Sequence, residues 1–587
     1  MSTTFKLPIA QSVLDVRLNT YDLSSFDYQK RRHEDWRENY ELYRDRVITN
    51  RLTQRQTVNI PLMKETIKTI LSRTDEAPDV LFESLGNQKQ KEIFLNEYWA
   101  LTLKNDRLIL KDIVDKKQVC LYGISWRKLM VYGGNFHSSV VDPHDIIVDR
   151  MADPTDIDGT AKYVKNQHLY ATISELERNE FYNQNIVGEI KTYFSTAQGI
   201  VKANENAEAA QNKADRLRDL GVPDVDNPAV GETIVELSEH YIKMNNPVEG
   251  YDEWWVITRA EGKQLSAFPL EYVVGETDDD YWCHHLPFVV WGDDIERTDL
   301  YSDGVADIVR QANKVANAWF SQLVENRTLR NFGMNYYDAT AADNFVPQTY
   351  EPAPWGWYPV PGDPNKIVKK VDIPDLSDSL DELTFLINMV ERATAATATE
   401  KGQQTQGQVT LGEIKLIAEK ALERITSIAK FYRLATEEFA YKWYKMVEAN
   451  GDYLEPVKLY KKGYRGNYFE QEIDADDWRD EAGYKVTVTS SSEQEDQSIK
   501  TIQKLRVVKQ EMPDNIPFLR IYQKKLLSLV KLTPEEEREV MEFEKQKMAA
   551  INGAMGNGAP GAPLPAPSQP ANQSVDQILK TTVEQLA

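Results

Sequence analysis

The chain has 587 residues, of which 41% are hydrophobic and 27% charged, and this is the composition of an ordinary globular protein with room for about four domains. Its formal net charge of −23 argues against a protein that grips nucleic acid, because such binding depends on basic side chains that neutralise phosphates. Only Cys120 and Cys283 are present, which excludes a disulfide framework and a zinc site of the usual spacing.

The first 302 residues alternate between helical and strand patterns. Helices are predicted over residues 28–47, 61–73, 89–117 and 172–196. Short strands are predicted within 118–150, where Gly123 and the pair Gly133-Gly134 would make turns, and at 235–243, 253–258, 268–274 and 288–291. Residues 197–232 are rich in Ala, Asn and Asp and are predicted to be a partly mobile insertion. Together these patterns indicate an α+β region.

The most regular helical pattern begins at Asp303. Apolar residues from Val305 to Val324 recur at three- and four-residue spacing, so they form one stripe on a helix. Asp303 and Asp307 lie in the first turn, and Arg327 and Arg330 lie near the end, where each charge suits the helix dipole. We therefore predict a helix over 303–331, about 40 Å long.

A segment rich in proline, glycine and tryptophan follows this helix. Residues 351–362 read EPAPWGWYPVPG, a composition that excludes a helix. Trp355, Trp357 and Tyr358 would lie on a loop tip, where exposed aromatic side chains mark contact surfaces. The alternative is that the two tryptophans cap the ends of the flanking helices. Partner contact is the favoured hypothesis, because the segment interrupts an otherwise plain helical hairpin.

A second helix begins near Ser379, which has capping-box spacing with Glu382. Its apolar stripe gives way to small Ala and Thr residues up to Thr399. A polar loop is predicted over 400–409. Its residues 400–408 include no apolar anchor, so the loop is predicted to be mobile, and its long side chains are Lys401, Gln403, Gln404, Gln406 and Gln408. A third helix then runs from Thr410 to Asn450, over roughly nine or ten turns.

Residues 451–587 show a succession of different sequence patterns. Residues 451–492 return to strand alternation, and residues 493–552 are predicted to be helical apart from a break at Pro513–Pro517. From 553 the chain is a Gly/Pro/Ala-rich linker. A short amphipathic stripe from Val575 to Leu586 ends it; a helix this short either docks or stays disordered, and docking is favoured.

Candidate catalytic and metal-binding residues form no complete set. Asp278, Asp279 and Asp280 are consecutive, and consecutive side chains do not converge on one ion, so a solvated turn is the better interpretation. Cys283-His284-His285 lacks a second ligand cluster. His144 lies beside carboxylates, but a proline turn with local hydrogen bonds explains it equally well. With no Walker A loop, no Gly-x-Ser-x-Gly elbow and no His-Glu-x-x-His pair, we predict no enzyme, no metal and no cofactor.

The cellular setting is predicted from two absences and from the low number of cysteines. No apolar run approaches the roughly 20 residues that span a bilayer, and the N-terminus lacks a signal-peptide core. Two cysteines in a chain of this size favour a reducing compartment. We expect a soluble protein that is made in a cytoplasm and has no membrane partner.

The order of these elements resembles the portal proteins of tailed bacteriophages. The run Val119–Leu129 resembles the glycine-containing strand pair of portal wings, and Val141–Asp149 resembles the V-x-P-x-D-I-x-x-D run that follows it, with Arg150 where many portals have proline. The resemblance covers most of residues 28–550. It depends on the order of the predicted helices, strands and loops rather than on any single motif.

The resemblance implies an α+β portal-type subunit that assembles into a ring. Its parts would be a wing (1–302), a stem helix (303–331), a clip (332–376), a second stem helix (377–399), a tunnel loop (400–409), a long wing or tunnel helix (410–450), wing return strands (451–492), a helical crown (493–552) and a disordered tail with a short terminal helix (553–587).

The resemblance also implies a function and partners. Portals are typically dodecameric rings at one capsid vertex of the virion, through which double-stranded DNA is packaged, retained and ejected. The partners would be a terminase, a head–tail adaptor, and the major capsid and scaffolding proteins. Lys401, Gln403, Gln404, Gln406 and Gln408 would contact the DNA, and Trp355, Trp357 and Tyr358 would dock the adaptor.

Two other classes stay open at this point. One is a metal-dependent hydrolase that uses the acidic residues between 278 and 294. The other is a helical scaffold or adaptor that binds a protein partner without closing a ring. Metal-dependent thermal stabilisation would favour the first, and subunit stoichiometry separates the second from a portal.

Overall fold

The computed structural model describes residues 5, 7–45, 58–73, 79–223, 232–246, 250–292, 299–331, 335–337, 368–370, 379–394, 411–462 and 468–489. The chain divides into two compact units, one of Met1–Lys461 with Phe469–Glu493 and one of Lys462–Tyr468 with Gln494–Ala587. Only Lys462 and Tyr468 of the second unit are described, so the fold below is that of the first. Among its described helices, none has both the length and the apolar character that a membrane crossing needs.

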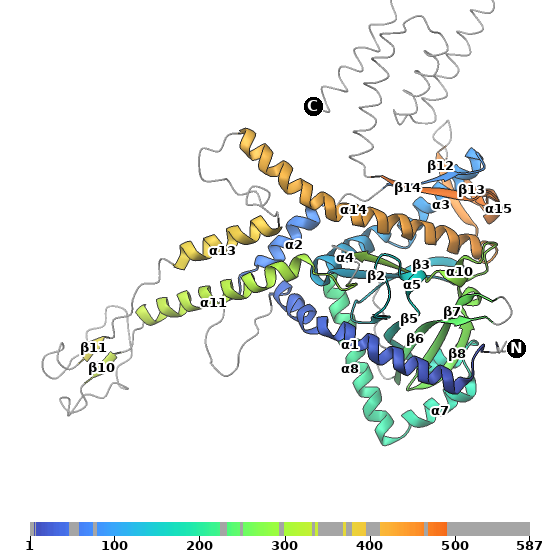
Figure 1. The fold of residues 1–587 in the computed structure, drawn as a ribbon, viewed down its shortest axis with the longest axis horizontal. Coiled ribbons are helices and arrows are strands. Elements are labelled where there is room, and N and C mark those ends of the chain that lie inside the picture. The colour runs from blue at the N-terminus through green and yellow to red at the C-terminus, as the bar shows by residue number, and fades with distance from the viewer. Residues whose placement is uncertain are drawn as a thin grey trace, which may run out of the picture. The chain divides into compact units, whose positions relative to one another are not determined.

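Helices and strands are both abundant, which confirms the α+β prediction (Figure 1). The helices are α1 (Gln11–Tyr43), α2 (Leu62–Arg73), α3 (Lys89–Asn105), α4 (Leu108–Tyr122), α5 (Ile157–Thr160), α6 (Ile173–Arg178), α7 (Gln184–Phe194), α8 (Ala197–Leu220), α9 (Leu270–Val274), α10 (Tyr281–His284), α11 (Val305–Asn331), α13 (Ser379–Thr394), α14 (Leu411–Ala449) and α15 (Ala475–Trp478). The strands are β1 (Asp79–Ser84), β2 (Ile124–Tyr132), β3 (Asn135–Val141), β4 (Ile146–Val148), β5 (Tyr163–Thr172), β6 (Ile234–Asn245), β7 (Asp252–Ala260), β8 (Lys263–Pro269), β9 (Phe288–Gly292), β10 (Asn335–Tyr337), β11 (Val368–Lys370), β12 (Val457–Lys462), β13 (Tyr468–Ile473) and β14 (Tyr484–Thr489).

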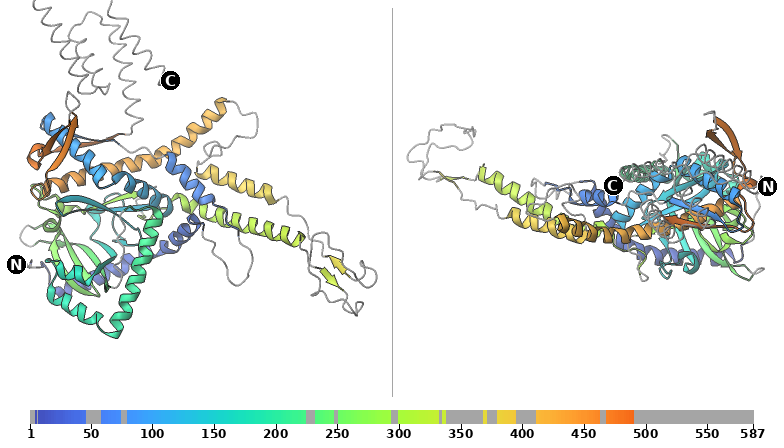
Figure 2. Two further views of the ribbon diagram at one scale, coloured as in Figure 1. Left: turned by 180° about the vertical axis from the view of Figure 1, so that it is seen from behind. Right: turned by 90° about the horizontal axis from the view of Figure 1, so that it is seen from above.

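Two antiparallel sheets form the centre of this unit. One has the order β4-β5-β6-β7-β8, and the other has the order β3-β2-β9, which places a strand from residue 288 beside one from residue 124. A third pairing joins β1 to β14, with Phe82 opposite Val486. Strands far apart in the sequence therefore pair, and the helices cover them (Figures 1 and 2).

The main core is unusually rich in tryptophan. Trp36, Trp126, Trp254, Trp282, Trp291 and Trp443 are all fully buried in it or nearly so. Trp443 of α14 packs edge-on against Trp99 of α3 with ring centroids 4.8 Å apart, and it also contacts Phe82 of β1. Aromatic pairs of this kind add to the stabilisation from burial alone. They hold the second half of α14 against the sheets.

A buried lysine fixes α14 to the same core. The Lys442 side chain is 2% exposed, and its Nζ donates to the carbonyl of Phe288 at 2.7 Å. It also pairs with Asp158 at 2.7 Å and Glu438 at 2.8 Å. Burial opposes the charge on Lys442, but these two carboxylates raise the pKa of the ammonium group above its ordinary value.

The prediction of strand from residue 118 is wrong for its first residues. Gln118–Tyr122 form the last turns of α4, and β2 begins at Ile124. The apolar run Val119–Tyr122 is buried on every side, and such a run has the same pattern in a buried helix and in a buried strand. Gly123 ends the helix with a φ of +78°, the left-handed conformation that favours glycine at this position.

The prediction of a partly mobile insertion over 197–232 is also wrong for its described residues. Residues 197–220 form α8, whose N-cap Thr196 accepts a hydrogen bond from the backbone N–H of Gly199 at 3.2 Å. Alanine is the strongest helix former, and Ala210 and Ala214 are buried on the inner face. The composition that indicated an insertion is that of a helix packed through small residues.

Candidate functional site

Helices α11 and α13 form a pair that leads away from the sheets (Figures 1 and 2). They lie side by side, and α11 begins at Val305, within the part of the unit that α1, α2 and α4 build. Beyond α11, the strand β10 pairs with β11, with Asn335 opposite Lys370. The helices predicted from residue 303 and from residue 379 therefore exist, and they make the feature of this unit that extends farthest from its core.

A nearly buried carboxylate fixes the start of α11. The Asp307 side chain is 6% exposed and lies 2.8 Å from a guanidinium nitrogen of Arg32 and 2.9 Å from one of Arg310. It also accepts hydrogen bonds from the backbone N–H of Gly304 and from Asn39, both at 3.0 Å. Arg32 and Asn39 belong to α1, so one side chain joins the first turn of α11 to α1.

The middle of α11 binds backbone N–H groups at the start of α2 and in the residues before it. Asn313, Asn317 and Ser321 are four residues apart, so they share one helix face. Their side-chain oxygens accept from the backbone N–H groups of Met63 (3.0 Å), Ile60 (2.8 Å) and Val58 (3.0 Å) in that order. These bonds satisfy backbone groups that α2 and the residues before it would otherwise leave unpaired.

Removing the Asp307 carboxylate should loosen the base of this helical pair. We expect Asp307→Ala to cost about 3 kcal/mol in the free energy of unfolding, since it leaves two partly buried arginines short of a partner. Asp303→Ala is the matched control: Asp303 also pairs with Arg32, at 2.8 Å, but its side chain is 70% exposed. It should cost less than about 1 kcal/mol. Equal losses in urea denaturation would contradict this account of α11.

Large apolar side chains are exposed on both helices of the pair. Ile308 and Val315 of α11 are 53% and 38% exposed, and Phe385 and Met389 of α13 are 65% and 52% exposed. Phe385 and Met389 are four residues apart and so lie on one face of α13. Large apolar side chains exposed together on one helix face mark an interaction surface.

The residues predicted to contact DNA and adaptor lie outside the described part of the chain. These are Lys401, Gln403, Gln404, Gln406 and Gln408 in the polar loop, and Trp355, Trp357 and Tyr358 in the segment after α11. The described elements that flank them are α13 and α14 for the loop, and β10 and β11 for the aromatic segment. Their roles stay predictions.

His144 belongs to a network of ion pairs rather than to a catalytic set. Its ring Nδ1 lies 2.6 Å from Asp142, and its backbone N–H donates to the same carboxylate at 3.0 Å, which confirms the turn with local hydrogen bonds. Burial opposes ionisation of Asp142, but Arg216 at 2.7 Å and His144 hold the pKa of the carboxyl well below its ordinary value. The next carboxylate, Asp145, pairs with His168 at 2.8 Å and Lys213 at 2.6 Å.

The acidic run and the Cys-His-His run also have structural roles. Asp278 and Asp279 form a turn, as predicted, and Asp279 pairs with Lys445 of α14 at 2.8 Å. His285 lies 3.1 Å from Asp158, and the Cys283 thiol lies 3.0 Å from Glu271. Across the described residues, no group of three or more His, Cys, Asp or Glu side chains could hold a metal ion. Asp293 and Asp294 fall outside those residues.

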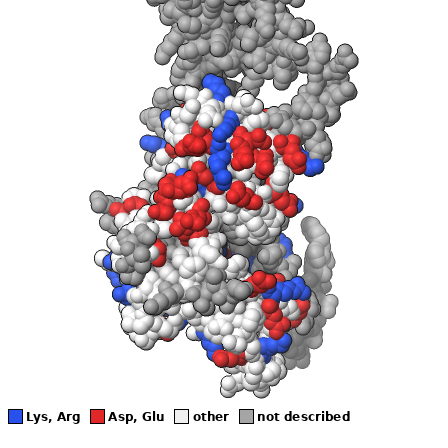
Figure 3. All heavy atoms as spheres, turned by 90° about the vertical axis from the view of Figure 1, so that its right-hand side faces the viewer, with Lys and Arg blue, Asp and Glu red and all other residues white. Residues whose placement is uncertain are grey.

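Acidic side chains gather on one face of the molecule (Figure 3). The elements at the right-hand side of Figure 1 include α10 and α15, and exposed acidic residues lie in and beside them, among them Asp278, Asp280, Asp476 and Asp477. A narrow line of Lys and Arg side chains crosses this face (Figure 3). Such a surface repels polyanions at short range.

One comparison with known proteins identifies a family. The family model described as "Phage SU10 portal protein" matches residues 38–542, which is most of the chain. Among solved structures, a chain from the "Virion of native gene transfer agent (GTA) particle" is 11% identical with a TM-score of 0.28; the match covers 82% of this chain and 90% of that one. No curated protein matches.

Proposed function

The chain belongs to the phage SU10 portal protein family, and from this premise we propose that it assembles into a dodecameric ring at one vertex of a phage capsid. The family is structural rather than enzymatic, so family membership does not support the alternative of a metal-dependent hydrolase. The ring would be the channel through which double-stranded DNA is packaged, retained and ejected. The single observation that carries the proposal is the family match over residues 38–542.

The paired helices supply the channel wall in this proposal. Helices α11 and α13 would be the stem, and Asp307 and the Asn313–Ser321 face would hold its base to the rest of each subunit. The exposed side chains of Phe385 and Met389 would be covered by the neighbouring subunit, because a surface that faces DNA and water gains nothing from large apolar groups. Ring closure would thus bury apolar area that a monomer leaves in water.

The charge of the chain suits a channel that DNA slides through. A net charge of −23 on each subunit repels phosphates, whereas clustered arginines would bind them tightly. We propose that Lys401 and the glutamines at 403, 404, 406 and 408 touch the DNA from the loop between α13 and α14. Glutamine can donate to phosphate without an ion pair, so such contacts are weak and little affected by salt.

The partners would attach at the two ends of the helical pair and around the ring. Trp355, Trp357 and Tyr358, in the clip between β10 and β11, would dock a head–tail adaptor. A terminase motor would engage the ring during packaging, and the major capsid and scaffolding proteins would hold it at the vertex of the virion.

Shortening the proposed tunnel loop should separate assembly from DNA handling. We expect deletion of Gly402–Gly407 to leave ring formation intact, because these six residues include no apolar side chain that could contribute to subunit contacts. DNA packaging or retention should fall, measured as the fraction of heads that contain full-length DNA. A deletion variant that no longer forms rings would contradict the assignment of this loop.

A further inference from the structure

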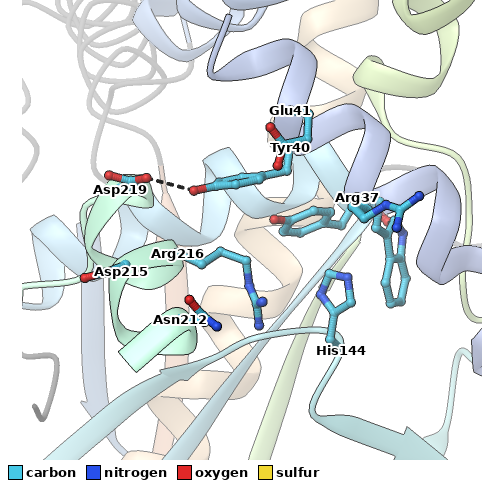
Figure 4. Close-up of a pocket in the computed structure, with 10 residues that line it drawn as sticks. Arg37, Tyr40, Glu41, His144, Asn212, Asp215, Arg216 and Asp219 are labelled. Carbon is cyan, nitrogen blue, oxygen red and sulfur yellow. Dashed lines mark hydrogen bonds between the residues drawn. The ribbon is translucent and has the colours of Figure 1, made fainter. Parts of the chain in front are cut away.

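A cavity of about 300 Å³ lies between α1 and α8 (Figure 4). Its wall includes Arg37 and Tyr40 from α1, Tyr122 from the end of α4, His144 from the turn before β4, and Asn212 and Arg216 from α8. In the view of Figure 4, His144 lies between Arg216 on one side and Arg37 on the other. The volume is at the lower end of the range for small-ligand sites.

The acceptors that line or adjoin this cavity are already paired. Asp219 accepts from the Tyr40 hydroxyl at 2.8 Å and lies 3.1 Å from Arg44. Asp215 pairs with Arg218 at 3.0 Å. Asp142, behind Arg216, is paired with that arginine and with His144. These carboxylates already have donors, so the cavity does not favour a ligand that only donates hydrogen bonds.

Several hydrogen-bond donors of the cavity have N–H or O–H groups that bond to no described residue. The Tyr122 side chain is 0% exposed, and its hydroxyl has no hydrogen-bond partner within the described structure. Arg216 makes one hydrogen bond among the described residues, from Nε to Asp142, which leaves both Nη groups. Arg37 is exposed and forms no ion pair with any described residue. A buried hydroxyl without a partner is costly, so its place on a cavity wall points to a ligand that accepts from it.

The Tyr122 hydroxyl lies among charged groups. The carboxylate of Asp142 and the guanidinium of Arg216 both act on it, and burial raises the pKa of the phenol well above its ordinary value. The hydroxyl is therefore a neutral donor at any ordinary pH. The hydroxyl lies near the Arg216 guanidinium, and a neutral O–H donor beside a cation favours binding of an anionic oxygen.

We propose that this cavity binds a carboxylate, held by the Nη groups of Arg216, by the Tyr122 hydroxyl and by Arg37. The planar guanidinium fork matches a carboxylate with two parallel hydrogen bonds. Glu41, Asp215 and Asp219 also line the cavity, so a dianion such as phosphate would meet more repulsion than a single carboxylate does. The carboxylate could come from a free small acid or from an acidic side chain of a second copy of this chain, and both share this chemistry.

Acetate is the probe for the free-acid source. Full-length protein is heated in sodium acetate and in sodium chloride at equal pH and ionic strength, and the unfolding midpoints are compared. We expect acetate to raise the midpoint, with an apparent affinity roughly tenfold weaker in Tyr122→Phe and in Arg37→Gln. Tyr163→Phe is the matched control, because the Tyr163 hydroxyl is bonded to His240 at 2.8 Å and neither residue lines this cavity. It should lower the midpoint in both salts equally.

A second arm tests the side-chain source. If acetate and chloride give the same midpoint, Tyr122→Phe should shift the assembly of the full-length protein to roughly tenfold higher concentration, measured by sedimentation velocity, while Tyr163→Phe should not. The proposal is overturned if Tyr122→Phe matches the wild type in both arms. It is also overturned if Tyr122→Phe destabilises the acetate-free protein as much as Tyr163→Phe does, because the hydroxyl would then have a partner within the chain. The acetate arm is independent of ring formation, so its failure leaves the proposed function standing.

Discussion

Replacing Gly123 by alanine should cost about 3–5 kcal/mol in the free energy of unfolding and leave much of the protein misfolded. Gly123 has a φ of +78°, and a Cβ placed there would lie 2.0 Å from the carbonyl oxygen of Ser302 and 3.1 Å from the backbone nitrogen of Gly304. Those atoms belong to the turn that leads into α11. The end of α4 and the start of the helical pair therefore meet backbone to backbone, and no side chain can move aside to make room.

Gly133→Ala separates the clash from the backbone strain. Gly133 also has a positive φ, of +60°, but a Cβ there would meet nothing within 4 Å. The control should cost about 1–2 kcal/mol, which is the penalty for alanine in the left-handed region alone. Urea denaturation of both variants measures the difference. If the two substitutions cost the same, the close contact between α4 and the start of α11 does not constrain the fold.

Placing a charge on the exposed apolar face of α13 should abolish ring assembly without unfolding the subunit. Phe385 is 65% exposed in the single chain, so Phe385→Asp removes little from its core. In the proposed ring the same position faces a neighbouring subunit, where an unpaired carboxylate is costly to desolvate at every interface. We expect the concentration for half-assembly to rise by roughly a hundredfold or more, measured by sedimentation velocity.

Phe181→Asp is the matched control for this variant. Phe181 is 62% exposed and lies between α6 and α7, away from the helical pair. The control should assemble like the wild type. If Phe181→Asp disrupts assembly and Phe385→Asp does not, the subunit contacts lie elsewhere and the face of α13 has another purpose.

The central helices were predictable from sequence because their apolar residues keep an unbroken period. Helix α11 occupies Val305–Asn331, within the predicted 303–331, and α14 occupies Leu411–Ala449, within the predicted 410–450. The N-terminal half of α1 was not predictable in this way. Its inward-facing positions include Ser25 and Gln29, and Gln29 is buried because it donates to the carbonyl oxygens of Pro143 and Ile146. Polar residues that are satisfied by a distant turn interrupt the apolar stripe.

The contacts of Asp307 and Tyr122 could be predicted only in part, because they depend on how distant segments pack. Asp307 stood out in the sequence as a favourable charge in a first helical turn, but its contacts with Arg32 and Asn39 depend on how α1 packs. Nothing in the sequence indicates that the Tyr122 hydroxyl lacks a partner, since that depends on every group around it. The aromatic and glutamine-rich segments are the reverse case: their composition predicts roles, and their residues lie outside the described structure.

Negative-stain electron microscopy of the purified full-length protein, together with its mass in solution, tests the central claim most directly. The portal account predicts closed rings with a central hole and a mass near twelve times that of the 67.4 kDa chain. A protein that stays monomeric or dimeric at high concentration, and also in the presence of capsid and scaffolding proteins, would contradict it and would favour a helical adaptor that does not form a ring.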